Sequence, residues 1–176
     1  KKYHMNKYSD DEIEKYLDEI KNENDSLGAE VELIINGVKA GLGEPPFAPL
    51  DGELARYMYL IPSVKSVSFG RGYGFAQSLG SEVADEMRVD AGEVKFLDNN
   101  NGGIIGGISN GADIVLSCVF KPIASIAREF KTINMKTMEN AEIKVNGRHD
   151  SSVVPRVYTI MKCYAALAIY DMLVSA

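Results

Sequence analysis

Histidine and cysteine are scarce in this sequence, which has two of each among 176 residues. Cys118 and Cys163 lie far apart, in a strand-like and a helix-like apolar run, so their spacing predicts neither a disulfide framework nor a metal motif. We expect two reduced, buried thiols, because free cysteine is among the most buried residue types. Neither His4 nor His149 has a cysteine beside it, which argues against a structural zinc site.

The sequence also lacks an excess of positive charge and long apolar stretches. Its formal net charge of -6 argues against a nucleic-acid-binding protein, which needs clustered Lys and Arg, although a small anion pocket remains compatible. No apolar run approaches the roughly 18–20 residues of a membrane helix, and the polar start KKYHMNKYSDD has no apolar signal core. We therefore expect a cytoplasmic protein with no membrane segment.

Helix signals are present in four places. Ser9 and Glu12 form a capping box that opens an amphipathic helix. Asp51 can cap a second helix, which Pro62 prevents from continuing. A third helix is plausible between glycine-rich turns, and the last is long enough to pack against a sheet. The expected ranges are residues 9–24, a helix after Asp51, 76–87 and 154–174.

Strand signals fill the segments between these helices. Alternating apolar residues predict strands at residues 29–35, 64–69, 114–120 (expected to be central), 129–135 and 142–145. Asn36-Gly37 and Asn110-Gly111 each stand between apolar runs and predict hairpin turns, and Asn146-Gly147 is a third pair of this kind. The order of elements predicts an α+β fold with an antiparallel sheet packed on helices. Residues 1–24 would lead into a domain over 25–176.

Four segments hold polar groups that packing alone would not require. The glycines of Gly102–Gly111 let a backbone approach a ring or a phosphate closely, but they also suit a bulged hairpin. A strand-end lysine can meet a ligand or merely be solvated, and a stiff proline loop can carry function or simply connect. The segments are Gly43–Phe47 with Leu50–Gly52, Gly102–Gly111, Lys121–Ser125 and Gly147–Asp150.

The last of these segments mixes charge with a titratable ring. Arg148 can hold a carboxylate or phosphate through two hydrogen bonds. Asp150 can be either a helix cap or a catalytic carboxylate, and local sequence does not separate the two. His149 could titrate near neutral pH, but a single histidine without a partner is more often structural.

Taken together and in this order, the motifs resemble the C-terminal half of the chorismate synthase family, from about Asp25 to the end of the chain. The motifs that carry the resemblance are GLGEPPFAPLDGELA, IPSVKSVSFG, GSEVADE, DNNNGGIIGGISNG, FKPIASI and GRHD before a proline-containing helix. The sequence departs from the family's usual pattern at Ser66, Ser68, Ala84, Asp98 and Ser151-Ser152.

The resemblance implies half of a β-α-α-β sandwich and a lyase of the shikimate pathway, which leads to the aromatic amino acids. The implied reaction is an anti 1,4-elimination of phosphate from 5-enolpyruvylshikimate 3-phosphate to give chorismate, with reduced FMN as cofactor. It implies that Asp150 is catalytic, because this carboxylate matches one placed near the flavin ring. The flavin-binding residues that it implies are Pro62, Ser63, Gly106, Lys121, Pro122, Ile123, Ala124, Ser125 and Arg148.

The family's N-terminal half supplies a Ser-His pair, a GRxSAR-type segment and a second catalytic histidine, and none of these strings occurs here. His4 matches neither histidine context. The resemblance therefore implies a fragment that is inactive alone and needs the missing N-terminal half, a source of reduced FMN such as a flavin reductase, and further copies of itself, since the family forms homotetramers. The alternative is a non-catalytic oligomerisation or flavin-binding module.

Overall fold

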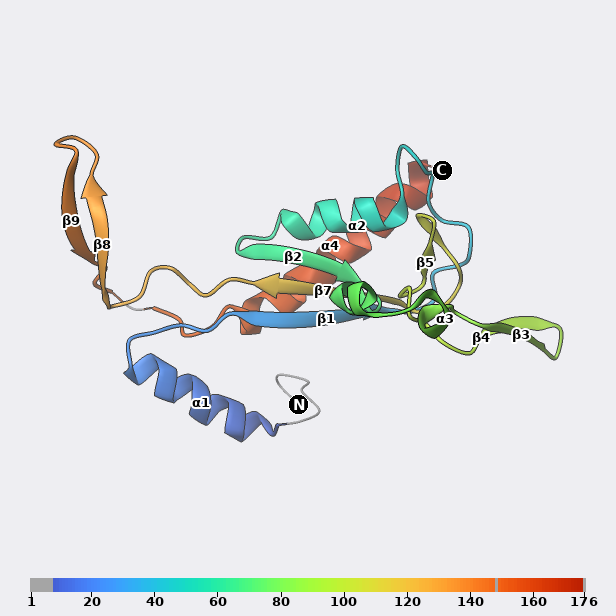
Figure 1. Ribbon diagram of the computed structural model, residues 1–176, viewed down its shortest axis with the longest axis horizontal. Helices are drawn as coiled ribbons and strands as arrows, with labels where there is room; N and C mark the ends of the chain where they lie inside the picture. Colours follow the sequence, from blue (N-terminus) through green and yellow to red (C-terminus); the bar gives the residue numbers. More distant parts are fainter. Residues whose placement is uncertain (1–7, 148, 176) are drawn as a thin grey trace. The chain divides into compact units, whose positions relative to one another are not determined.

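The computed structural model describes residues 8–147 and 149–175, whose helices and strands form the expected α+β fold (Figure 1). Contacts divide the chain into two compact units. The first contains the chain up to Ala29 together with Phe120–Arg156, and the second contains Glu30–Val119 together with the chain from Val157 on. The predicted boundary between residues 24 and 25 stays a prediction, because the units are defined by contacts alone.

The first unit contains the helix α1 (Asp10–Asn22) and the antiparallel strands β8 (Glu129–Asn134) and β9 (Glu139–Lys144). The capping box of α1 is confirmed: the Glu12 N–H donates to Ser9 Oγ at 3.2 Å, and the Ser9 N–H donates to a Glu12 carboxylate oxygen at 2.8 Å. β9 begins three residues earlier than the sequence suggested.

A three-stranded sheet in the second unit has the order β1 (Ala29–Ile35), β7 (Ile114–Phe120) and β2 (Val64–Phe69). The central position of β7 is therefore confirmed. Its side chains alternate between buried and more accessible positions, and Ile114 and Leu116 are fully buried. This alternation is the pattern expected of a strand with one face in a core.

Two helices contribute core residues to the second unit, α2 (Leu50–Tyr59) and α4 (Val154–Ser175). The Tyr57 hydroxyl of α2 lies 3.3 Å from a carboxylate oxygen of Asp171 on α4, and its ring meets that of Tyr164 edge-on. The buried helix residues are spaced by three or four, as one helical face requires. They are Leu50, Leu54 and Met58 on α2 and Val157, Met161, Ala165 and Ala168 on α4.

Helix α4 has the length and composition of a membrane helix, although the sequence contains no unbroken apolar run of that length. Its 22 residues are long and apolar enough to cross a membrane by length and composition, with a mean hydropathy of 1.4 in its most apolar window. Lys162 and Asp171 interrupt its apolar residues. The core helix of a soluble protein can have the same length and composition.

The hairpin predicted at Asn36-Gly37 does not form, since β1 pairs with β7 instead. The backbone that follows Gly37 is held elsewhere: Ser109 Oγ donates to the Lys39 carbonyl at 2.6 Å, and the Gly41 N–H donates to the Ser109 carbonyl at 2.9 Å. A local turn signal was therefore overridden by long-range pairing.

Asn110-Gly111 is likewise not a hairpin turn. The short antiparallel strands β5 (Ile104–Ile105) and β6 (Ile108–Ser109) are joined by Gly106-Gly107, and Asn110-Gly111 leads from β6 into β7. Gly106 and Gly107 have φ values of +60° and +81°, the left-handed conformation that a two-residue hairpin turn demands.

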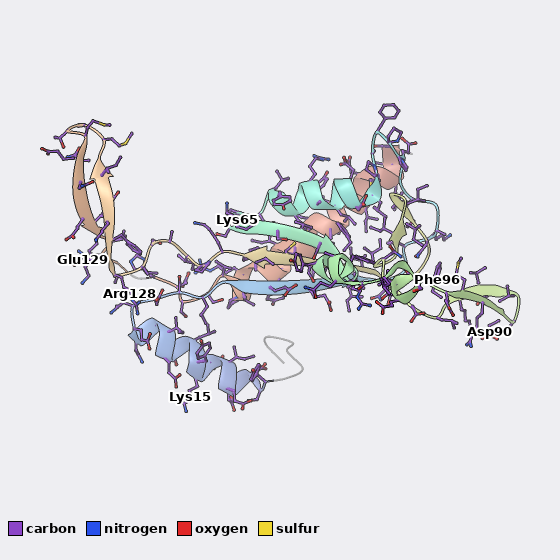
Figure 2. The ribbon with its side chains drawn as sticks, in the orientation of Figure 1. Lys15, Lys65, Asp90, Phe96, Arg128 and Glu129 are labelled. Carbon is purple, nitrogen blue, oxygen red and sulfur yellow. The ribbon has the colours of Figure 1, made fainter. Side chains whose placement is uncertain are left out.

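The helix predicted over residues 76–87 is wrong. That region contains a 3₁₀ helix (η1, Gly72–Gln77), a four-residue helix (α3, Gly80–Val83) and the start of an antiparallel hairpin, β3 (Met87–Asp90) with β4 (Glu93–Phe96). Asp90 and Phe96 are labelled on this hairpin in Figure 2, and the register places Asp90 next to the turn and Phe96 at the open end. The turn residues between the strands have positive φ, at +53° and +86°.

Two smaller expectations also fail. Asp51 does not cap α2, because Pro49 is the cap residue and the Leu50 N–H at the helix start donates to the Gly107 carbonyl at 2.8 Å.

Cys163 is exposed, although Cys118 is buried as expected. Burial raises the pKa of the Cys118 thiol to about 11. Cys163 lies on a side of α4 that the other described elements leave exposed.

Candidate functional site

The predicted site residues fall into both units. Lys121–Ser125 and Asp150 belong to the first unit, whereas Pro62, Ser63 and Gly106 belong to the second. Arg148 lies outside the described residues.

The segment Lys121–Ser125 follows β7 directly and is anchored through its backbone. Ser26 Oγ donates to the Ile123 carbonyl at 2.7 Å. A Cβ added to Gly28 would stand 2.8 Å from the Phe120 carbonyl oxygen, so the chain passes this segment closely. Lys121 and Ser125 remain exposed. The backbone is held on one side while a cation and a hydroxyl stay available to a ligand.

Asp150 does not serve as the cap of α4. The Val154 N–H, in the first residue of that helix, donates to Ser152 Oγ at 3.3 Å. Asp150 instead pairs with Arg156 at 2.8 Å, with 43% of the Asp150 side chain exposed. Of the two roles left open by the sequence, the cap is thus filled by another residue, and the carboxylate is accessible at the molecular surface.

Residues 26–28 connect these two predicted segments. On one side Ser26 binds the Ile123 carbonyl, and on the other the Leu27 N–H donates to the Ser151 carbonyl at 2.8 Å. Leu27 and Ser152 form a parallel β-bridge. The first unit therefore brings Lys121–Ser125 and the Asp150 region together.

His149 lies beside Asp150 and has a backbone contact. Its Nε2 is 3.2 Å from the Val145 carbonyl oxygen. This fits the structural role weighed for a lone histidine. Among the described residues, no group of three or more His, Cys, Asp or Glu side chains could hold a metal ion.

In the second unit, Pro62 and Ser63 form the turn that connects α2 to β2. The Val64 N–H donates to the Ile61 carbonyl at 3.4 Å, and Ser63 has a φ of +75°. Proline followed by a residue with positive φ is the pattern of a type II turn, whose third position normally takes glycine. Strained backbone of this kind is often found at functional positions, which agrees with the functional role predicted for Ser63.

Gly106 lies at the other end of α2. The neighbouring Gly107 carbonyl accepts from Leu50 at the helix start, whereas Pro62 follows the helix end. A ten-residue helix is about 15 Å long, so the second unit does not bring Gly106 next to Pro62-Ser63. A Cβ added to Gly106 would meet nothing within 4 Å. This glycine therefore leaves open space around it.

The proline loop packs against the same glycine turn. A Cβ on Gly107 would lie 2.6 Å from Pro49 and 3.3 Å from Pro45, and Gly43 is in close contact with the Gly107 carbonyl. Phe47 at the loop tip is 93% exposed. Two of the four segments singled out in the sequence, GEPPF and the glycine block, thus form one structural element.

Asp85 is the residue that sequence reasoning missed. Its carboxylate accepts hydrogen bonds from the backbone N–H groups of Asn100 and Asn101 and from Asn101 Nδ2, the last at 2.9 Å. Partial burial raises the pKa of Asp85, but these hydrogen bonds outweigh burial and the net pKa lies below the usual value. The signal was available, because both motifs involved, GSEVADE and DNNNGG, belong to the resemblance.

Gly70 completes this junction, which we call the asparagine junction and define as Gly70, Asp85 and residues 99–103. The Gly70 N–H donates to the Val115 carbonyl, and a Cβ at Gly70 would collide with the Asn100 carbonyl oxygen. The Gly103 N–H donates to Asn99 Oδ1 at 2.7 Å. The junction thereby fixes the backbone that leads into β5 and the Gly106 turn.

Comparison with known proteins identifies the fold first and the family next. A solved structure described as "Crystal Structure of Chorismate Synthase" aligns with a TM-score of 0.76 and 29% sequence identity, over 94% of this chain and 43% of that one. The α+β fold is therefore that of part of a chorismate synthase. The sequence matches the family description "Chorismate synthase" over residues 2–174. The chain belongs to the chorismate synthase family.

Curated relatives agree with this assignment. The chorismate synthase of Methanosarcina barkeri is 45% identical over 161 residues, which cover 90% of this chain and 44% of the relative. That of Methanocaldococcus jannaschii is 43% identical over 164 residues, covering 93% and 43% respectively. The chain thus spans well under half the length of the relatives it matches.

Proposed function

We propose that this chain contributes part of a chorismate synthase active site and is inactive without protein equivalent to the remainder of its relatives. The complete site would eliminate phosphate from 5-enolpyruvylshikimate 3-phosphate to give chorismate. The observation that carries this proposal is the match in sequence and fold, which covers nearly all of this chain but under half of each relative. Substrate positioning contributes strongly to rate, so half of a site should retain little activity.

Reduced FMN fits the chemistry of the residues present, and it would supply transient electron density that helps the phosphate leave. Lys121 and Ser125 present a cation and a hydroxyl suited to a phosphate, and Gly106 leaves room for a flat group. We infer that Pro62, Ser63, Pro122, Ile123, Ala124 and Arg148 also line the flavin site. These roles follow the family resemblance.

Asp150 is the carboxylate that we assign to proton transfer. Its side chain pairs with Arg156, and residues 26 and 27 bond the backbones of Ile123 and Ser151, next to Asp150. A positioned general acid or base typically contributes about 10²–10⁴-fold to a rate. Loss of this carboxyl should therefore affect turnover far more than flavin affinity.

The test of this proposal is complementation. The purified chain is mixed with the N-terminal part of the M. barkeri relative, reduced FMN and substrate under anaerobic conditions, and chorismate is followed by its absorbance. Activity in the mixture alone is the expected result. In the active mixture, Asp150→Asn should slow turnover by at least about 100-fold with FMN affinity unchanged. Wild-type rates in this variant would remove Asp150 from the mechanism.

Asp90→Asn is a matched control, because Asp90 is also a partly exposed carboxylate in a 2.8 Å ion pair, with Lys95. It should leave turnover unchanged. A mixture that neither forms chorismate nor changes the flavin spectrum would favour a non-catalytic assembly module. The apolar side chains exposed on α4, Leu167, Tyr170 and Leu173, are the observation that favours this alternative.

The partners and location are part of the proposal. We expect the chain to associate with protein equivalent to the N-terminal part of its relatives, to use reduced FMN supplied by a flavin reductase or another donor, and to self-associate. A cytoplasmic location is supported by the two free thiols, because secreted proteins usually pair their cysteines.

A further inference from the structure

The β8–β9 ribbon is a pair of strands without a sheet around it. In the part of the chain that the structure describes, β8 and β9 pair only with each other, as Figure 1 also shows. All six residues of β8 are exposed, and so are all but one in β9. An isolated two-stranded hairpin is marginal in water, and each open edge is a template for another strand. The ribbon therefore needs an additional partner.

One face of the ribbon carries a cross-strand apolar pair. The register sets Phe130 on β8 opposite Ile143 on β9. Phe130 is 38% exposed and Ile143 50% exposed, so the pair is accessible to another molecule. Aromatic and β-branched residues paired across strands are favourable contacts in sheets.

The opposite face carries charge in a complementary arrangement. Two of its three cross-strand pairs join opposite signs, Glu129 with Lys144 and Lys131 with Glu142, and the third joins Ile133 with Asn140. Along β8 itself the sequence reads Glu129, Phe130, Lys131, so an acid and a base flank the aromatic residue symmetrically. A strand with this pattern is complementary to its own antiparallel copy.

We propose that the outer edge of β8 is a docking surface for β8 of a second copy of this chain, paired antiparallel about a two-fold axis at Phe130. The contact would join two ribbons into a four-stranded sheet over the three β8 residues Glu129, Phe130 and Lys131. In this register Glu129 faces Lys131 of the second copy, and Lys131 faces its Glu129. An interface with two-fold symmetry uses the same surface patch on both subunits.

Continuing the register across all four strands gives uniform rows. On one face Ile143 and Phe130 of one copy meet Phe130 and Ile143 of the other, an apolar row. On the opposite face each row alternates in sign through the four charged residues already named. Moving the axis by one residue sets Lys131 against Lys131 or Glu129 against Glu129, and like charges directly opposite are destabilising. An axis at Thr132 would set Lys131 opposite Ile133 and Glu129 opposite Met135, so neither charge would face a charged residue. The axis at Phe130 is the one that pairs both charges with an opposite charge.

The β8 edge suits pairing with another strand better than the β9 edge does, because the start of β8 is held in place. Arg128, directly before β8, pairs with Asp25 at 3.0 Å and with Glu23 at 3.6 Å, and its Nε donates to the Glu23 carbonyl. Figure 2 shows Arg128 and Glu129 at the base of the ribbon. These bonds hold the start of β8 to the end of α1. Beyond β9, the Val145 carbonyl is already in contact with His149.

This inference deepens the self-association in the proposed function and rests on it, but not on the lyase chemistry. Disulfide trapping tests it in a Cys163→Ser background, which removes the exposed native thiol. Phe130→Cys places two Cβ atoms about 4.5–5.5 Å apart across the axis, close enough for a disulfide. Mild oxidation should therefore give a covalent dimer on a non-reducing gel.

Ile143→Cys and Thr132→Cys are the positional controls. Ile143 is separated from its copy by three strand spacings, about 14 Å, and Thr132 by four residues along the strand, about 13 Å. Both should crosslink at least about tenfold more slowly, because a disulfide requires Cα atoms within about 7 Å. Preferential trapping at Ile143, equal trapping at all three positions, or no trapping at any would overturn the proposal.

A charge swap provides a second test that does not rely on cysteine. The variant Glu129→Lys, Lys131→Glu, Glu142→Lys, Lys144→Glu keeps opposite signs in every pair, both within the ribbon and between identical copies. It should self-associate like the natural chain in sedimentation experiments. Mixed with the natural chain, however, it sets like charges opposite, so mixed dimers should be at least about tenfold rarer than chance. Free mixing of the two chains would contradict the proposed register. Neither test uses flavin or substrate, so failure would leave the elimination proposal intact.

Discussion

Asp85→Asn should destabilise the second unit through the asparagine junction. The natural carboxylate accepts three hydrogen bonds, from two backbone N–H groups and one side-chain amide. An asparagine keeps one acceptor oxygen but turns its NH₂ group towards a donor. Hydrogen bonds to a charged group contribute about 1.5–3 kcal/mol when buried. Because Asp85 is only partly buried, screening by solvent reduces the expected loss to about 1–2 kcal/mol.

The effect should depend on pH in one direction. The pKa of Asp85 is lower in the folded chain than the value of about 3.9 in an unfolded one, so its contribution is fully present above about pH 4. It is lost as the pH falls through the folded pKa. The difference between the variant and the natural chain should therefore be constant from pH 7 to pH 5 and shrink below pH 4.

Urea unfolding followed by circular dichroism measures this difference. With a slope of about 2 kcal/mol per molar urea, the midpoint should fall by about 0.5–1 M at pH 7. Hydrogen exchange at Gly102 and Gly103 would assign the change to the junction, since the two units need not unfold together. An unchanged midpoint at pH 7, or a full difference persisting well below pH 4, would refute the reasoning. Asp90→Asn is the control and should shift the midpoint little.

Two further outcomes follow from the same geometry. The Gly70→Ala variant should lose about 3 kcal/mol or more of unfolding free energy in thermal or urea unfolding, because its Cβ would collide with the Asn100 carbonyl. The Gly106→Ala variant should lose only about 1 kcal/mol, since its Cβ meets left-handed strain without a clash. Equal losses in the two variants would contradict this account. With a thiol reagent at pH 8, Cys163 should react in the folded chain and Cys118 only after unfolding, because Cys118 is buried and its pKa is about 11. Rapid reaction of two thiols per folded chain would show that β7 is not held in a core.

Elements with strong periodicity could be predicted from the sequence. The capping box at Ser9, the strand 64–69 and the long C-terminal helix appear where the pattern placed them. The turn signals failed where distant partners competed. Asn36-Gly37 has the composition of a hairpin turn, but β1 pairs with the better-buried strand β7. The backbone at Lys39, which would have belonged to the second strand of that hairpin, accepts a hydrogen bond from Ser109 instead.

The candidate site shows the same division. Its segments could be recognised as motifs, and the resemblance named their family. The sequence could not reveal that Asp85 joins two of those motifs, or that residues 26–28 lie between Ile123 and Ser151, because both depend on contacts between distant parts of the chain. The β3–β4 hairpin was not predicted, because its strands are only four residues long and their turn, Ala91-Gly92, lacks an asparagine.

The position of residues 26–28 has a consequence for how the chain is made. The bond from Ser26 to Ile123 spans 97 positions, and the bond from Leu27 closes an even longer loop. During synthesis these residues leave the ribosome well before either acceptor exists. The first unit therefore cannot close until Ser151 has been synthesised, whereas α2 and β2 of the second unit can begin to pack much earlier.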